Sequence, residues 1–157
     1  ARSVADCGVG EVVARGEKGS VAVFGLACDI VMPCALGDAV GEAEAQTIQA
    51  KLVVEGANGP LTPGADHVLA DRGVVVIPDV YANAGGVTCS YLEQCQNFAH
   101  LTWDEDEVNA RVIDLMRAAF EKFYAFAQES RLPYRLAASV LGVKTIADAH
   151  RMRGLHP

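Results

Sequence analysis

Three short apolar runs, each followed by a loop of small residues, constrain the fold of this chain more than any other feature. The runs are DIVM at 29–32, KLVVE at 51–55 and VVVI at 74–77. They are rich in β-branched residues and do not alternate with polar ones, which is typical of parallel strands covered on both faces of a sheet. Pro33 and Pro78 end two of the runs, because proline cannot donate a hydrogen bond to a neighbouring strand.

Helical patterns separate these runs. Thr62-Pro63 has the residue types of an N-cap and a first helical position, and it predicts a helix to about Arg72 with Gly73 as its stop. Weaker helices are predicted over 4–14, 42–49 and 87–97. The alternation of strands and helices indicates an open, doubly wound parallel sheet. Three strands are few for such a sheet, so it looks incomplete at its N-terminal side.

The last third of the chain has the pattern of two amphipathic helices. The first is predicted to begin at a capping box, Thr102–Glu105. Its apolar stripe is Val108, Val112, Leu115, Ala119, Phe123 and Ala127. The second follows Pro133, with the stripe Leu136, Val140, Val143, Ala147 and His150. Together these patterns predict an α/β chain: a partial Rossmann-like sheet followed by a helical C-terminal tail.

Composition excludes several classes of partner. The formal charge is −7 and neither half of the chain is basic, so no nucleic-acid partner is expected. The longest uncharged interior stretch, 80–92, is too short and polar to span a bilayer, and no secretory signal is visible. The five cysteines form no CxxC motif and are expected to be free, mostly buried thiols in a reducing, cytoplasmic setting. Because the first residue is Ala1 rather than Met, we expect a processed or partial polypeptide.

The loops after the three runs have the residue types of a ligand site. Ligands of doubly wound sheets bind beyond the carboxyl ends of the strands, where 33–37, 56–60 and 79–87 would meet. Glycine and alanine permit close approach of a flat ligand, and the amides of Asn58 and Asn83 offer donors and acceptors. Strand-to-helix turns contain Gly, Asn and Pro for structural reasons too. Three such loops at consecutive strand ends favour a site.

Catalytic and metal-binding motifs are not found. The G-x-G at 8–10 is incomplete, because Val13 stands where the third glycine of a phosphate-binding turn belongs. No lysine lies at the carboxyl end of a predicted strand, and the histidines are scattered. The four carboxylates at 104–107 sit at a helix N-terminus, where they offset the helix dipole. We therefore assign no catalytic and no metal-binding residue.

Two long motifs carry a resemblance to a known family. EGANGP at 55–60 and PDxxANAGGVxxSYxE at 78–93, with CDIVMPCAL at 28–36, closely resemble glutamate dehydrogenases of the Glu/Leu/Phe/Val dehydrogenase family, over about residues 18–157. The resemblance implies oxidative deamination of L-glutamate to 2-oxoglutarate and ammonia with NAD or NADP, by a homo-oligomeric enzyme. It also implies that residues 1–100 are part of the dinucleotide-binding domain and contain only its later strands. Residues 101–157 would be C-terminal helices that pack on the same domain.

The resemblance also implies roles for individual residues. Val87 would line the substrate pocket, and Ser90 would hydrogen-bond the side-chain carboxylate of glutamate. The residues that would contact the coenzyme are Pro33, Ala35, Gly56, Ala57, Asn58 and Asn83.

The chain also departs from the family pattern. The Gly-rich turn, the first strands and the catalytic lysine and aspartate have no match here, so we expect the isolated chain to be inactive. Its uncovered sheet edge favours oligomers or poor solubility. One alternative is a fragment of a leucine, phenylalanine or valine dehydrogenase, to which PCALG at 33–37 is somewhat similar; EGANGP and Ser90 favour glutamate. The other alternative is a non-catalytic nucleotide-binding or regulatory module.

Overall fold

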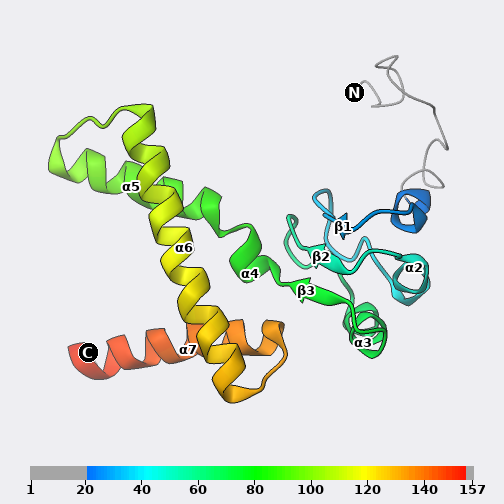
Figure 1. Cartoon of the computed structure of the whole chain (residues 1–157). Coiled ribbons are helices and arrows are strands. Elements are labelled where there is room, and N and C mark those ends of the chain that lie inside the picture. Colours follow the sequence, from blue (N-terminus) through cyan, green and yellow to red (C-terminus); the bar gives the residue numbers. More distant parts are fainter. Residues whose placement is uncertain (1–20, 155–157) are drawn as a thin grey trace, which may run out of the picture.

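A small parallel sheet and a layer of long helices make up the computed structural model, which describes residues 21–154 (Figure 1). The helix expected at 4–14 lies outside the described residues. In the sheet half, the elements are η2 (Val23–Gly25), β1 (Ile30–Val31), α2 (Glu42–Thr47), β2 (Leu52–Val54), α3 (Pro63–Asp71) and β3 (Val75–Ile77). The helices that follow are α4 (Asp79–Ala82), α5 (Ala84–Ala99), α6 (Glu105–Ser130) and α7 (Tyr134–Arg153).

The three predicted strands all form and pair in parallel, in the order β1-β2-β3. Each is shorter than its apolar run. Val31, Val53 and Val76 lie opposite one another in the register and so share one face of the sheet. The α/β fold class with a partial Rossmann-like sheet and a helical tail is confirmed.

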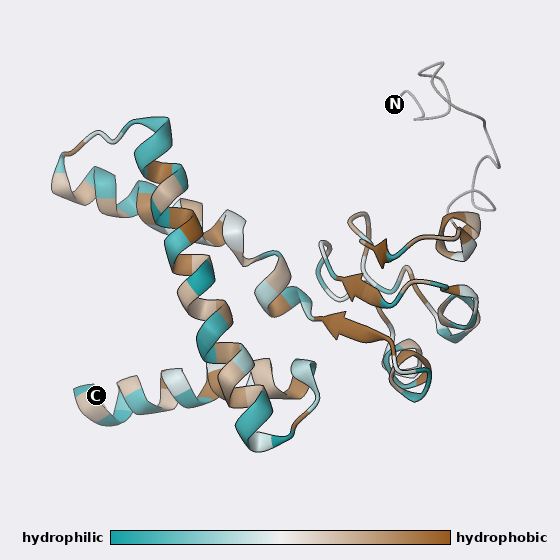
Figure 2. Cartoon of the chain, viewed as in Figure 1, coloured by the Kyte–Doolittle hydropathy of each residue, from teal (hydrophilic) through white to brown (hydrophobic). Residues whose placement is uncertain are grey.

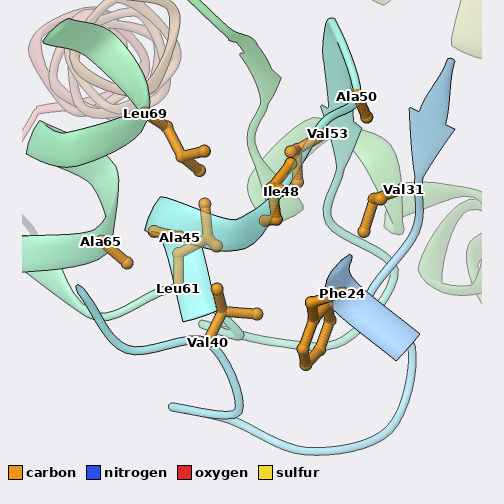
Figure 3. Packing of buried hydrophobic residues seen from close by; sticks show 10 residues of the cluster. All are labelled: Phe24, Val31, Val40, Ala45, Ile48, Ala50, Val53, Leu61, Ala65 and Leu69. Atoms are coloured by element: carbon orange, nitrogen blue, oxygen red, sulfur yellow. The ribbon is translucent and has the colours of Figure 1, made fainter. Parts of the chain in front are cut away.

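The main hydrophobic core lies on one face of this sheet. Figure 3 shows its side chains converging from β1, β2, η2, α2, α3 and the segments between them. Ile48 and Leu69 are fully buried. On the opposite face, Ile30 is 52% and Val75 is 43% exposed, so the prediction that both faces are covered was wrong for the described residues. The strands join the sheet in chain order, β1-β2-β3, and right-handed crossovers between such strands place both connecting helices on the same face of the sheet. The helices α2 and α3 do lie together (Figure 1).

The predicted helix at 63–72 forms with its predicted ends. The hydroxyl of Thr62 accepts a hydrogen bond from the backbone N–H of Ala65 at 3.2 Å, as an N-cap should. The chain leaves α3 through Gly73, whose φ of 71° suits glycine.

Arg72, at the end of α3, ties that helix to α2. Its guanidinium donates to the carbonyl oxygens of Ala45 and, at 2.6 Å, of Ile48. These carbonyls belong to the last turn of α2 and the residue after it, which would otherwise lack partners. The α2 helix ends at Thr47, two residues before the predicted end.

A helix, rather than the predicted loop over 79–87, follows β3. The four residues of α4 begin immediately after Pro78, and only Asn83 interrupts the helical path before α5. The predicted helix at 87–97 is therefore the middle of a longer one. Asn83, Gly85 and Gly86 are poor helix formers, which is why the sequence predicts a loop, but packing of α4 and α5 on neighbouring elements outweighs these propensities.

The long helix α6 begins two residues later than predicted. Asp104, and not Thr102, is its N-cap, with Oδ1 accepting from the N–H of Glu107 at 2.8 Å. Of its predicted apolar stripe, only Phe123 and Ala127 are buried. They meet Tyr81 of α4 and Tyr134 of α7 in an aromatic cluster that joins the helices.

The last helix, α7, packs through a face that the periodicity did not predict. Ala137 is fully buried against α6, with Leu141 one turn further on, whereas Leu136 and Val143 of the predicted stripe are exposed. Apolar and polar residues are mixed along this helix (Figure 2) and the apolar ones are not confined to one face, so periodicity alone could not select the packed side. Alanine allows the close approach of two helices, which here decides it.

The cysteines are free but not buried. Cys28, Cys34 and Cys89 are exposed and Cys95 is half-buried, and all four are free thiols. The prediction of free thiols is confirmed for these four, and the prediction of burial was wrong. Cys7 lies outside the described residues.

Neither a membrane span nor a metal cluster occurs in the part of the chain that the structure describes. None of its helices is both long and apolar enough to cross a bilayer. Nowhere within 21–154 do three His, Cys, Asp or Glu side chains gather as metal ligands would.

Candidate functional site

The three predicted loops meet in a hollow of about 610 Å³ at the carboxyl ends of the strands. Residues following β1, β2 and β3 all contribute to its wall: Cys34, Ala35, Leu36, Gly37, Gly56, Ala57, Asn58, Asn83 and Val87. Of the predicted site residues, only Pro33 and Ser90 lie outside this lining. Cys34, Leu36 and Gly37 line it too, and all three belong to the predicted loop at 33–37.

Backbone hydrogen bonds join the first two loops. The buried Pro33 accepts from the N–H groups of Gly56, at 3.1 Å, and Ala57, at 2.9 Å. Further along, the N–H of Asp38 donates to the carbonyl of Gly59 at 2.8 Å. Pro33 thus lies beneath the wall and acts through its carbonyl oxygen, which places the second loop against the first.

Glycines in the wall are required by the closeness of these loops. A Cβ added at Gly56 would come within 2.5 Å of the sulfur of Cys34. One added at Gly37 would lie 3.2 Å from the carbonyl oxygen of Asn58. Because these glycines carry no side chain, a flat ligand can approach the backbone there closely.

Two amides from different loops face each other in the site. Nδ2 of Asn83 donates to Oδ1 of Asn58 at 2.7 Å. This bond uses one N–H of Asn83 and one oxygen of Asn58, so it does not consume the NH2 of Asn58 or the carbonyl oxygen of Asn83. The pair can therefore present both donors and acceptors to a ligand, as the sequence predicted for each residue separately.

A second set of hydrogen bonds, made by Asp79, holds the segments that carry these amides. The carboxylate of Asp79 accepts from the N–H of Gly59 at 2.7 Å, and the N–H of Asp79 donates to Glu55 at 2.8 Å. Gly59 follows Asn58 directly, and Asp79 begins the helix α4, whose C-cap is Asn83. Asp79 therefore sets the spacing between the two loops that carry the amides.

Arg135 of α7 completes this arrangement. Its guanidinium donates two bonds of 2.9 Å to Glu55, whose side chain is 0% exposed, and two bonds of 2.9 and 3.1 Å to Asp66. Asp79 lies 3.9 Å away. We call these four residues the Arg135 cluster. Burial alone would lower the pKa of the Arg135 guanidinium, but hydrogen bonds to Glu55 and Asp66 outweigh burial and raise that pKa, so the group stays charged.

Sequence reasoning missed the Arg135 cluster. One signal was available, because Glu55 ends an apolar strand where a carboxylate needs a buried partner. Nothing local identified that partner, which lies 80 residues further along the chain.

The two residues predicted to contact a substrate share α5. Val87 lines the main hollow and also a neighbouring one of about 460 Å³. Ser90, one turn further along, lines only the second hollow, with Tyr91 and Glu93. The two hollows therefore meet at Val87.

Known proteins resemble this chain over most of its length. Residues 6–154 match the model of a family described as Glutamate/Leucine/Phenylalanine/Valine dehydrogenase, so the likeness begins earlier than the motifs indicated. The NAD-specific glutamate dehydrogenase of Staphylococcus aureus (strain COL) is 45% identical over 132 residues, which are 84% of this chain and 32% of that protein.

Solved structures give the same result. The hetero-hexameric glutamate dehydrogenase from Thermus thermophilus (Leu bound form) matches with a TM-score of 0.84 and 31% identity, over 88% of this chain and 33% of that one. The glutamate dehydrogenase from Peptoniphilus asaccharolyticus matches with a TM-score of 0.76 and 39% identity, over 80% of this chain and 32% of that one. This chain thus spans about a third of the length of the proteins it matches.

Proposed function

This chain belongs to the glutamate/leucine/phenylalanine/valine dehydrogenase family, and from that premise we propose that it is the C-terminal part of the coenzyme-binding domain of a glutamate dehydrogenase. The described part of residues 1–100 supplies the sheet and the site, and 101–157 supply the helices that pack on the same domain. The whole protein would oxidise L-glutamate to 2-oxoglutarate and ammonia, as a homo-oligomer. Identity to proteins named as NAD-specific glutamate dehydrogenases supports NAD, rather than NADP, as the coenzyme.

The observation that carries this proposal is the meeting of three loops around the Asn58–Asn83 pair. The lining fits a nicotinamide dinucleotide, since Ala35, Gly56 and Ala57 leave the backbone open to a flat ring and the amides can pair with ribose hydroxyls or a carboxamide. When bound, the coenzyme accepts the hydride from the substrate. The residues of this chain would bind and orient the coenzyme. The general base of the reaction would come from a part of the family's enzymes that this chain does not match.

Val87 and Ser90 are proposed for the substrate side. Because Val87 separates the coenzyme hollow from the one that Ser90 lines, a glutamate held by Ser90 would lie next to the coenzyme site. Replacing Ser90 with alanine in the complete enzyme should raise the KM for glutamate and reduce its preference over leucine, because the substrate carboxylate loses a donor. Unchanged selectivity would favour a leucine, phenylalanine or valine dehydrogenase instead.

Coenzyme binding tests the proposal directly. NADH is titrated into the full polypeptide that carries this sequence while nicotinamide fluorescence is followed, with and without glutamate. Loss of one hydrogen-bonding amide should weaken binding by about three- to tenfold, so we expect this change for Asn83→Ala and for Asn58→Ala. Asn109→Ala, on the exposed surface of α6, is the matched control. Absence of NADH binding, or equal affinities in all three variants, would refute the assignment.

A further inference from the structure

The Asn58–Asn83 pair is held in place by a chain of bonds that ends at an arginine outside the site. We propose that Arg135 of α7 is a positioning residue for coenzyme binding, acting on this pair through two intervening carboxylates. The inference rests on the proposed function, because it concerns the same site. Arg135 does not line the coenzyme hollow and lies instead at a separate cavity between α3, β3 and the turn from α6 to α7.

The first step of the chain joins Arg135 to Glu55. Both terminal nitrogens of the guanidinium donate to the two oxygens of this carboxylate, each at 2.9 Å. Such a bidentate pair fixes orientation as well as distance. Since Glu55 directly precedes Gly56, the pair holds the end of β2 where the second loop of the site begins.

The second step joins Glu55 to both amides. Oε2 of Glu55 accepts from the N–H of Asp79 at 2.8 Å, and the Asp79 carboxylate accepts from the N–H of Gly59 at 2.7 Å. On one side, Gly59 is bonded covalently to Asn58. On the other, Asp79 begins the four-residue helix α4, whose C-cap is Asn83. A shift of Asp79 therefore moves the two amides relative to each other.

The positive charge of Arg135 is necessary to this series of hydrogen bonds. One guanidinium stands among three carboxylates, those of Glu55, Asp66 and Asp79, within 2.9–3.9 Å. Without it, Glu55 would be a buried charge with no cation, next to the like charge of Asp79. Repulsion between them would push the start of α4 away from the end of β2. A lysine would supply the charge but could not form the same forked contacts with Glu55 and Asp66.

A merely structural role makes a different prediction. If Arg135 only fastens α7 to the sheet, its loss lowers the free energy of unfolding and leaves the coenzyme affinity of the folded protein unchanged. If it positions the amides, affinity falls in protein that is still folded. Measuring affinity at a temperature where circular dichroism shows full folding separates the two roles.

The experiment compares four proteins, each as the full polypeptide that carries this sequence. NADH affinity is measured by nicotinamide fluorescence for the unsubstituted protein, Arg135→Met, Arg135→Lys and the control Arg151→Met. Arg151 is an exposed arginine of the same helix, paired at 3.0 Å with Asp148 of that helix. We expect Arg135→Met to raise the Kd by roughly three- to thirtyfold and Arg135→Lys to raise it less. Arg151→Met should stay within about twofold.

A double substitution tests the route. If Arg135 acts through Asp79, adding Asp79→Asn to Arg135→Met should weaken binding by much less than the product of the two separate effects. Independent effects that multiply would overturn the route. A folded Arg135→Met protein with unchanged affinity would overturn the inference while leaving the coenzyme site in place. If that variant does not fold, Arg135→Lys decides in the same way, and absence of NADH binding by the unsubstituted protein overturns the proposed function as well.

Discussion

Two glutamate–arginine pairs of almost equal length provide a sharp test of how burial sets the strength of an ion pair. Glu55 and Arg135 lie 2.9 Å apart, and the Glu55 side chain is 0% exposed. Glu107 and Arg111, one turn apart on α6, lie 2.8 Å apart with side chains 44% and 45% exposed. Replacing each glutamate with glutamine removes the charge and keeps the shape, so the comparison sets a buried carboxylate with three hydrogen bonds against an exposed one with a single bond to its arginine.

The buried pair should be far more sensitive. Glu55 accepts two bonds from Arg135 and one from the N–H of Asp79, all charge-assisted. A glutamine has one acceptor oxygen, and its NH2 would face another donor. Removing one partner of a buried ion pair costs about 3–5 kcal/mol, whereas an exposed pair one turn apart on a helix contributes about 0.3–0.5 kcal/mol. We therefore expect Glu55→Gln to lower the free energy of unfolding by about 3–5 kcal/mol and Glu107→Gln by under about 0.5 kcal/mol.

The free energy of unfolding of each variant is measured by urea titration, with circular dichroism as the signal. The two variants should have the m-value of the unsubstituted protein, so that a change in midpoint reports stability alone. Equal losses of stability in the two variants would refute the reasoning. So would a loss under about 1 kcal/mol for Glu55→Gln, because the buried carboxylate would then not depend on its partners.

Three further predictions concern the core, a helix cap and the wall of the site. Leu69→Ala, at a fully buried position, should lower the free energy of unfolding measured in urea by about 2–5 kcal/mol. Leu136→Ala, at a position 49% exposed, should lower it far less, and equal losses would contradict the assigned core. Thr62→Ala removes the cap of α3 and should cost about 1 kcal/mol in the same assay, with Thr62→Ser close to neutral, and a cost for Ser as large as that for Ala would argue against capping. Gly56→Ala should weaken NADH binding, because the added methyl group clashes with the Cys34 sulfur. Adding Cys34→Ala to that variant should restore most of the affinity. A fluorescence titration that shows no recovery would mean that this clash is not the cause.

The parts of the fold that local sequence determines could be predicted. The three strands follow from short β-branched runs, two of them ended by proline, and α3 follows from a threonine cap and a glycine stop. The meeting of three loops follows from the geometry of parallel strands, whose carboxyl ends share one edge. Asn58 and Asn83 were predicted separately from their residue types, and the structure brings them to 2.7 Å.

Features that depend on distant partners could not be predicted. Both sides of α7 carry apolar residues, and only contact with α6 shows that Ala137, not Leu136, is buried. The start of α5 reads as a loop because Gly85 and Gly86 disfavour helix locally, and packing decides otherwise. Arg135 looks like an ordinary helical residue until the fold places it against a carboxylate 80 positions earlier in the chain.

The separation of Glu55 from Arg135 also orders the events of synthesis. Translation proceeds from the N-terminus at about 5–20 residues per second, so the 80 residues between them take on the order of ten seconds to make. The segments that form α3 and β3 are made within that interval, but the carboxylate has no Arg135 to accompany it into the interior. A lone buried charge is costly, so Glu55 would stay in contact with water or take up a proton until the arginine arrives. We therefore expect the nascent sheet to close over its own carboxyl end only after α7 has been made.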